Sequence, residues 1–215
     1  MSAQPNLLSF PAAPQSLVEK YKPMRIQDFA GLAKVKEGLL RFTEKPYSAS
    51  FIFKGDSGTG KSTMARIVAE QIDAELVHVP AQECSVDRLR SVVSNCRYAP
   101  MSGCRFWLVL VDEADSMSKA ARDFLLSPLD KLPPLTVFVF TCNSVESFEG
   151  RFMSRSMVLD FSNYGIQKDA AELLAEVWKQ EAPGKESPNV ARIIKDAQGN
   201  VRAALKALEW ELKLI

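Results

Sequence analysis

The organisation of this chain follows from eight residues, Gly55-Asp56-Ser57-Gly58-Thr59-Gly60-Lys61-Ser62. They fit the complete pattern G-x-x-x-x-G-K-[ST], which is typical of loops that bind phosphate groups. The preceding residues 51–54 predict a short strand, and residues 63–72 predict a helix with one apolar face. This motif requires a glycine-rich loop between a strand and a helix. The eight residues therefore predict a phosphate site at the start of a helix.

The residue types in this loop suit the binding of a nucleotide. Glycines let the backbone curl so that its N–H groups point at phosphates, and the helix N-terminus adds a partial positive charge. Lys61 would reach the β- and γ-phosphates, and the Ser62 hydroxyl would hold Mg²⁺. We expect contacts to the nucleotide from Gly55 through Thr63. The alternative, a glycine-rich turn without a ligand, leaves the Lys61-Ser62 pair unexplained.

Polar residues follow two further apolar runs that read as buried strands. Asp112 and Glu113 follow residues 106–111, and Asn143 follows residues 136–141. Ligands of open α/β sheets bind at the carboxyl ends of the strands. Asp112 would support Mg²⁺, Glu113 would polarise the attacking water, and Asn143 would bind that water or the γ-phosphate. The alternatives are a strand that stops at charged residues for solubility and a turn asparagine.

Composition limits the classes of function. Lys and Arg number 27 and Asp and Glu 26, a net charge of +1, so DNA binding would need a local patch or several copies. The four cysteines lack C-x-x-C spacing and the only histidine, His78, reads as structural or surface, so we expect free thiols and no zinc cluster. We expect no membrane span and no secretory signal. The expected location is cytoplasmic, or the nucleoid or nucleus if the protein acts on DNA.

The chain divides into three expected segments. Residues 1–16 read as a loose tail, residues 17–163 as a nucleotide-binding α/β domain, and residues 164–215 as a small helical lid. Taken alone, residues 17–23 read as an extended segment that ends at Pro23. Five strands are expected at 51–54, 76–79, 106–111, 136–141 and 157–161, with helices after Gly31 and at 63–72, 86–93 and 120–129. This alternation predicts a doubly wound parallel sheet.

Several motifs together resemble the AAA+ ATPases, and among them the clamp-loader group typified by replication factor C small subunits. The resemblance spans residues 17–212. Its motifs are the box Glu19-Lys20-Tyr21-Lys22-Pro23, the Walker B stretch Asp112-Glu113-Ala114-Asp115-Ser116-Met117, the sensor 1 strand Thr141-Cys142-Asn143, the triplet Ser154-Arg155-Ser156 and the sensor 2 helix Gly199-Asn200-Val201-Arg202-Ala203-Ala204-Leu205.

The resemblance implies roles for individual residues. Tyr21 and Pro23 would lie near the adenine, and Asn143 would act as the sensor. Arg155 would act as a finger on a neighbour's nucleotide, and Arg202 would reach the γ-phosphate from the lid. The implied fold is a P-loop NTPase domain with a five-stranded parallel sheet and a helical lid, and the implied cofactors are ATP and Mg²⁺.

The implied function is that of an ATP-hydrolysing switch in DNA replication or repair. The partners would be further identical or different subunits, with nucleotide at their interfaces, a sliding clamp, and primed or duplex DNA. Arg88 and Arg90 resemble a DNA-tracking stretch, although a solvated helix face explains them as well. Two alternatives stay open: a remodeller from another AAA+ branch, such as branch migration or replication restart, and a weakly hydrolysing scaffold that regulates a partner.

The sequence departs from the family at three places. Ser156 replaces the usual cysteine, and Leu32 follows Gly31 where glutamine is usual. The family also carries a collar domain after the lid, for which these 215 residues leave no room. Because the collar holds the pentamer together, we expect a weak assembly.

Overall fold

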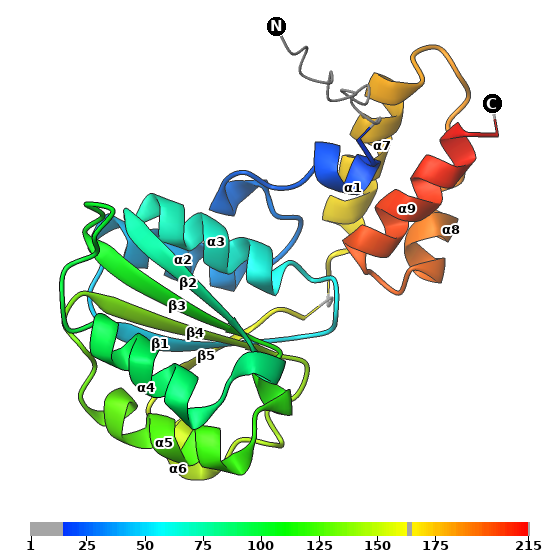
Figure 1. The fold of residues 1–215 in the computed structure, drawn as a ribbon. Helices are drawn as coiled ribbons and strands as arrows, with labels where there is room; N and C mark the ends of the chain where they lie inside the picture. The colour runs from blue at the N-terminus through cyan, green and yellow to red at the C-terminus, as the bar shows by residue number, and fades with distance from the viewer. Residues whose placement is uncertain (1–14, 163–164, 215) are drawn as a thin grey trace, which may run out of the picture.

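A five-stranded parallel sheet is the centre of the molecule (Figure 1). The computed structural model describes residues 15–162 and 165–214, so residues 1–14 of the predicted tail lie outside it. The strand order is β2-β3-β4-β1-β5. The strands are β1 (Ala49–Lys54), β2 (Ala74–Pro80), β3 (Phe106–Asp112), β4 (Thr136–Cys142) and β5 (Met157–Asp160). All five predicted strands are confirmed, as is the doubly wound fold class.

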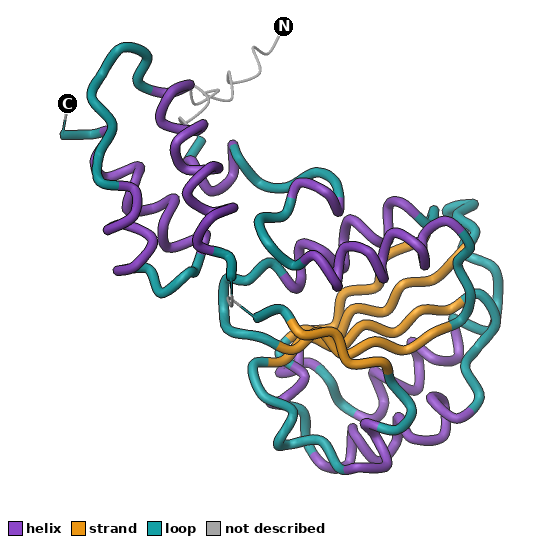
Figure 2. Tube along the Cα trace, turned by 180° about the vertical axis from the view of Figure 1, so that it is seen from behind, coloured by secondary structure: helices purple, strands orange, loops and turns teal. Residues whose placement is uncertain are grey.

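Helices cover both faces of the sheet (Figures 1 and 2). One face carries α2 (Ala33–Glu44) and α3 (Lys61–Gln71), and the other carries α4 (Val86–Asn95), α5 (Lys119–Asp130) and α6 (Gly150–Met153). Short 3-10 turns at Ile26–Asp28, Ala81–Glu83 and Ala114–Ser116 complete this domain. The four-residue helix α6 was not predicted, because four residues are too few to show the spacing of apolar residues that is typical of a helix.

The continuous apolar runs of the strands are divided between two cores. In β3, Leu108 and Leu110 pack on the α2–α3 side, whereas Val109 and Val111 pack on the α4–α5 side. Successive side chains of a strand point to opposite faces, so a strand covered on both faces must be apolar throughout. The apolar side chains of β1 and β4 alternate between the same two cores.

The strand register brings the predicted site residues to one edge. Lys54 of β1 lies opposite Cys142 of β4, and Pro80 of β2 lies opposite Asp112 of β3. The phosphate loop directly follows Lys54, Glu113 follows Asp112, and Asn143 follows Cys142. They therefore meet at the carboxyl edge of the sheet.

The C-terminal helices form a separate apolar cluster, the lid. It contains α7 (Gln167–Glu181), α8 (Val190–Asp196) and α9 (Val201–Leu212). A short helix, α1 (Leu17–Lys20), replaces the extended segment that the residues alone suggested; its Leu17 is buried in this cluster. The Leu17 amide donates to Glu209 Oε2 (3.2 Å), and Lys20 pairs with Glu181. Residues 17–20 therefore pack on the lid, whereas the sequence pattern assigns them to the α/β domain.

No helix among the described residues is long and apolar enough to cross a membrane. Within the same residues no group of three or more histidine, cysteine and acidic side chains is arranged to hold a metal ion. All four cysteines are free thiols, and only Cys104 is partly exposed.

These thiols should differ sharply in reactivity. Burial raises the pKa of Cys84, Cys96 and Cys142 to about 11, so almost no thiolate forms at neutral pH. We expect one fast-reacting thiol per native chain when an aromatic disulfide reagent is added at pH 7.5, and four after denaturation. Cys104→Ser should remove the fast phase. Rapid reaction of more than one thiol in the native protein would contradict the buried placement of the other three.

Candidate nucleotide-binding site

The glycines of the phosphate loop adopt backbone conformations that other residues avoid. Gly58 and Gly60 have φ angles of +84° and +91°. A Cβ on Gly60 would lie 2.6 Å from the ring of Phe29, and one on Gly55 would lie 2.4 Å from the carbonyl oxygen of Phe161. Glycine is therefore required for the loop to curl against its neighbours. The helix α3 begins directly after Gly60. The free N–H groups of its first turn therefore point into the space inside the loop.

Lys61 lies buried beneath the loop, with 9% of its surface exposed. Its Nζ donates to the backbone carbonyls of Gly55 and Asp56 and lies 3.3 Å from Asn143 Oδ1. Burial lowers the pKa of Lys61, whereas nearby acidic groups partly offset that effect. The ammonium group is thus held at the loop by neutral acceptors, and no carboxylate among the described residues forms an ion pair with it. A phosphate would supply the missing countercharge.

Asp112 and Ser62 form the group that fits a divalent cation. Ser62 Oγ donates to Asp112 Oδ1 over 2.7 Å, and the Thr141 hydroxyl donates to the same oxygen. Burial alone would raise the pKa of Asp112. The hydrogen bonds from Ser62 and Thr141, together with nearby His78, outweigh the effect of burial, so the pKa of Asp112 is lowered. The carboxylate therefore stays charged. A hydroxyl beside a charged carboxylate suits Mg²⁺, which prefers oxygen ligands.

Glu113, the residue that follows Asp112, lies at a bend of the backbone. Its φ of +58° is in the left-handed region, which is rare for residues other than glycine and asparagine. The Glu113 amide donates to Thr141 Oγ1 (3.1 Å), so one hydroxyl fixes both acidic residues. Gln82 Nε2 donates to Glu113 Oε2 over 3.2 Å and so fixes the direction of the carboxylate.

Two adjoining cavities share this edge of the sheet. One, about 330 Å³, is lined by Lys61, Ser62, Asp112, Glu113, Asn143 and neighbouring loop residues. The other, about 400 Å³, lies between the α/β domain and the lid and is lined by Tyr21, Pro23, Phe29 and Leu205, among others. Gly58, Gly60, Thr63 and Arg202 line both cavities. The first cavity suits phosphates and a cation, and the second suits a base and sugar.

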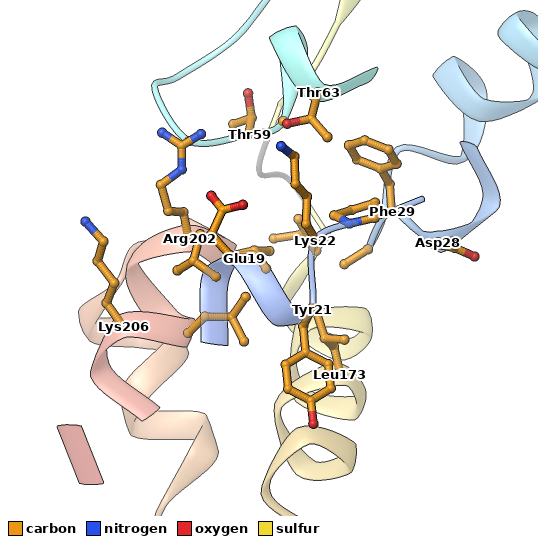
Figure 3. Close-up of a pocket in the computed structure, with 18 of the residues that line it drawn as sticks. Glu19, Tyr21, Lys22, Asp28, Phe29, Thr59, Thr63, Leu173, Arg202 and Lys206 are labelled. Carbon is orange, nitrogen blue, oxygen red and sulfur yellow. The ribbon is translucent and has the colours of Figure 1, made fainter. Parts of the chain in front are cut away.

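Arg202 reaches the site from the lid. Figure 3 shows its side chain extending from α9 toward Thr59 in the loop. No ion pair is found for this guanidinium among the described residues, so its charge is available to a phosphate. By contrast, the Tyr21 ring points away from the cavity toward α7 (Figure 3). Its hydroxyl donates to Glu181 (2.5 Å), and burial together with Glu181 raises its pKa to about 12.

Arg155 lies far from its own chain's site. It comes two residues before Met157, which pairs with Phe51 in the register, whereas the loop follows Lys54. At about 3.3 Å per residue, the strand segment from Phe51 to Lys54 alone accounts for roughly 10 Å, and Arg155 lies beyond its far end. Arg155 makes a two-pronged ion pair with Asp130, with contacts of 2.6 and 3.0 Å. The sequence brings Arg155 to the opposite end of the sheet from Lys61.

The two predicted DNA-contacting arginines differ in their surroundings. Arg90 pairs with Asp87 and lies 5.7 Å from the ring centre of Phe124. Arg88 is exposed, and no ion pair is found for it among the described residues. Of these two arginines, only Arg88 therefore presents an uncompensated charge to solvent, near the start of α4.

Some neighbours of the site were not predicted as site residues, among them Gln82, Thr141, Asp115 and His78. Asp115 Oδ2 accepts from the Asn143 amide (3.1 Å), and His78 Nε2 lies 3.5 Å from Asp112 Oδ2. Thr141 had a local signal, since it is a polar residue at the end of an apolar run. Gln82 had none, because its contact with Glu113 depends on the pairing of β2 with β3.

Known proteins with similar sequences include replication factor C small subunits. The replication factor C small subunit of Methanococcus maripaludis is 26% identical over 199 residues, which is 89% of this chain and 63% of that protein. The corresponding protein of Halobacterium salinarum is 25% identical over 198 residues. Thus the chain spans about three-fifths of the length of these relatives.

Solved structures show the same fold. The RuvB Holliday junction branch migration motor of Thermotoga maritima superposes with a TM-score of 0.73 at 17% identity, covering 88% of this chain and 64% of that one. Residues 51–162, just over half of the chain, match the family described as "ATPase family associated with various cellular activities (AAA)". The phosphate loop, the Asp112-Glu113 pair and Asn143 all lie within the matched residues. This chain is therefore a member of the AAA family of ATPases.

Proposed function

We propose that this protein binds and hydrolyses ATP with Mg²⁺, and that it acts as a clamp-loader-type switch on DNA. The observation that carries the proposal is the meeting of Lys61, Ser62, Asp112, Glu113 and Asn143 around one cavity. Lys61 and Arg202 would bind the phosphates, and Ser62 with Asp112 would hold the cation. When bound, Mg²⁺ would neutralise phosphate charge. Glu113 would accept a hydrogen bond from the attacking water, and Asn143 would help to orient it.

The likeness to replication factor C small subunits supports the clamp-loader type. It extends over 89% of the chain, through both the α/β domain and the lid. Within this proposal the protein works in an assembly with nucleotide at subunit interfaces, and its partners are a sliding clamp and primed or duplex DNA. Arg88 is the better candidate for phosphate contact, because Arg90 is already paired with Asp87.

A branch-migration motor is the second candidate, and the fold likeness to RuvB favours it. Steady-state ATPase assays separate the two. Primed DNA with a sliding clamp should stimulate a clamp loader, whereas a four-way junction should stimulate a branch-migration motor. A protein that binds ATP but turns over slowly with either DNA would instead fit a regulatory scaffold.

Lys61→Ala tests the site assignment. Loss of a charge-assisted contact to phosphate costs about 1.5–3 kcal/mol, or roughly 10- to 150-fold in affinity. Isothermal titration with ATP and Mg²⁺ measures it. Lys45→Ala, at an exposed lysine just after α2, is the matched control and should bind as the wild type does. Equal affinity in the Lys61→Ala protein would remove the assignment.

A further inference from the structure

Asn200 joins the lid directly to the phosphate loop. Its Nδ2 donates to the carbonyl oxygen of Ser57 over 2.8 Å, and its Oδ1 accepts from the Ala203 amide over 3.1 Å. The second contact caps the first turn of α9. One side chain therefore starts a lid helix and holds the loop, across 143 residues of sequence.

The two segments are shaped for this contact. A Cβ on Gly58 would lie 2.6 Å from both polar atoms of the Asn200 amide, so glycine permits the lid to approach this closely. On the lid side, a tight turn precedes Asn200, with Gly199 at φ +75°. The Asn200 amide donates to Ala197 O (2.9 Å), which fixes the turn to the end of α8. The position of Asn200 is thus set by the lid's own backbone.

Only an amide side chain can make both contacts. Asparagine carries a donor and an acceptor, whereas an ionised aspartate only accepts and serine is too short to span from the cap to the loop. The Ser57 carbonyl and the Gly58 N–H belong to one planar peptide and point in opposite directions. A donor on Ser57 O therefore sets the direction of the Gly58 N–H. Gly58 lines both cavities, so this direction is a property of the phosphate site.

We propose that Asn200 is a positioning residue that couples lid docking to the orientation of the Ser57–Gly58 peptide. Arg202 follows in the same turn of α9 and lines both cavities, so the docked lid also places the Arg202 charge at the phosphates. The inference rests on the proposed function only for the identity of the ligand. Nucleotide binding and lid docking then support each other.

Asn200→Asp tests the coupling, because aspartate caps helices as well as asparagine does but cannot donate. The matched control is Asn189→Asp: Asn189 caps α8 in the same way (3.0 Å to the Arg192 amide) and lines neither cavity. We expect hydrogen–deuterium exchange of the nucleotide-free protein to be about fivefold faster in residues 55–62 of the Asn200→Asp protein, the effect of losing one neutral hydrogen bond. The control should keep wild-type exchange there.

Binding supplies the second readout. ATP affinity should fall about tenfold in Asn200→Asp and less than twofold in Asn189→Asp. Asn200→Ser keeps a cap and should reproduce the loss if the aspartate variant fails to fold. Wild-type loop exchange or wild-type ATP affinity in the Asn200 variants would overturn the coupling. If the wild type binds no ATP, the proposed function fails, whereas the exchange comparison still decides the role of Asn200.

Discussion

Replacing Arg155 by alanine should reduce ATP turnover by about 10³- to 10⁵-fold and leave ATP binding intact. An arginine supplied by a neighbour has an effect of this size in other nucleotide hydrolases, because it stabilises charge that develops in the transition state. Arg155 lies at the opposite end of the sheet from Lys61, so within one chain it does not reach the phosphates. Arg151→Ala is the matched control: this nearby arginine is exposed and, like Arg155, ion-paired, in its case with Asp123 and Glu149.

Mixing two inactive variants tests whether Arg155 acts across a subunit boundary. Arg155→Ala subunits keep an intact nucleotide-binding site, and Lys61→Ala subunits keep Arg155. Each should be inactive alone, and the mixture should recover part of the turnover at mixed interfaces. The assay should include DNA and the clamp, because these are the proposed partners of the assembly. Full specific activity of a dilute wild-type monomer would show instead that Arg155 has a structural or internal role, through its ion pair with Asp130.

Glu113→Gln should lower turnover at least about 100-fold and leave ATP affinity near that of the wild type. Glutamine keeps the size of the side chain and an acceptor oxygen but removes the charge that polarises water, an effect comparable to loss of a positioned general base. Affinity should persist because the phosphates are bound by the loop, Lys61 and Arg202. Paired titration and phosphate-release measurements check both halves of the prediction.

The control for this variant is Glu83→Gln, at an exposed glutamate in the neighbouring 3-10 turn. It makes the same chemical change outside both cavities and should keep wild-type turnover. If Glu113→Gln also keeps its turnover, another residue activates the water. A large loss of ATP affinity in Glu113→Gln would show that the carboxylate serves binding.

The α/β domain could be predicted because its signals are local. The apolar run 106–111 is buried on both faces, as its continuity indicated, and the glycine loop carries its own geometry within eight residues. The strand order was not predicted, because the pairing of parallel strands leaves little trace in either strand alone. The meeting of Asp112 with Ser62 came from the expectation that strand ends share one edge, which the register confirms.

The contacts that orient the site could not be read from the sequence. Gln82 reaches Glu113 only because β2 pairs with β3, and Asn200 reaches Ser57 only because the lid folds back over the loop. Tyr21 shows the same limit. Its motif places it near a base, and it lines the cavity, yet its hydroxyl binds α7 of the lid. Such pairings depend on tertiary structure, whereas a motif encodes only residue types and spacing.

Phosphate release from ATP, measured side by side for the wild type, Lys61→Ala and Glu113→Gln, is the most direct test of the central claim. The proteins should be assayed at high concentration with Mg²⁺ and primed DNA, and ATP binding should be measured in the same samples. We expect release by the wild type alone, with ATP bound by both the wild type and Glu113→Gln. Release by Lys61→Ala or Glu113→Gln at the wild-type rate would contradict ATP hydrolysis at this site.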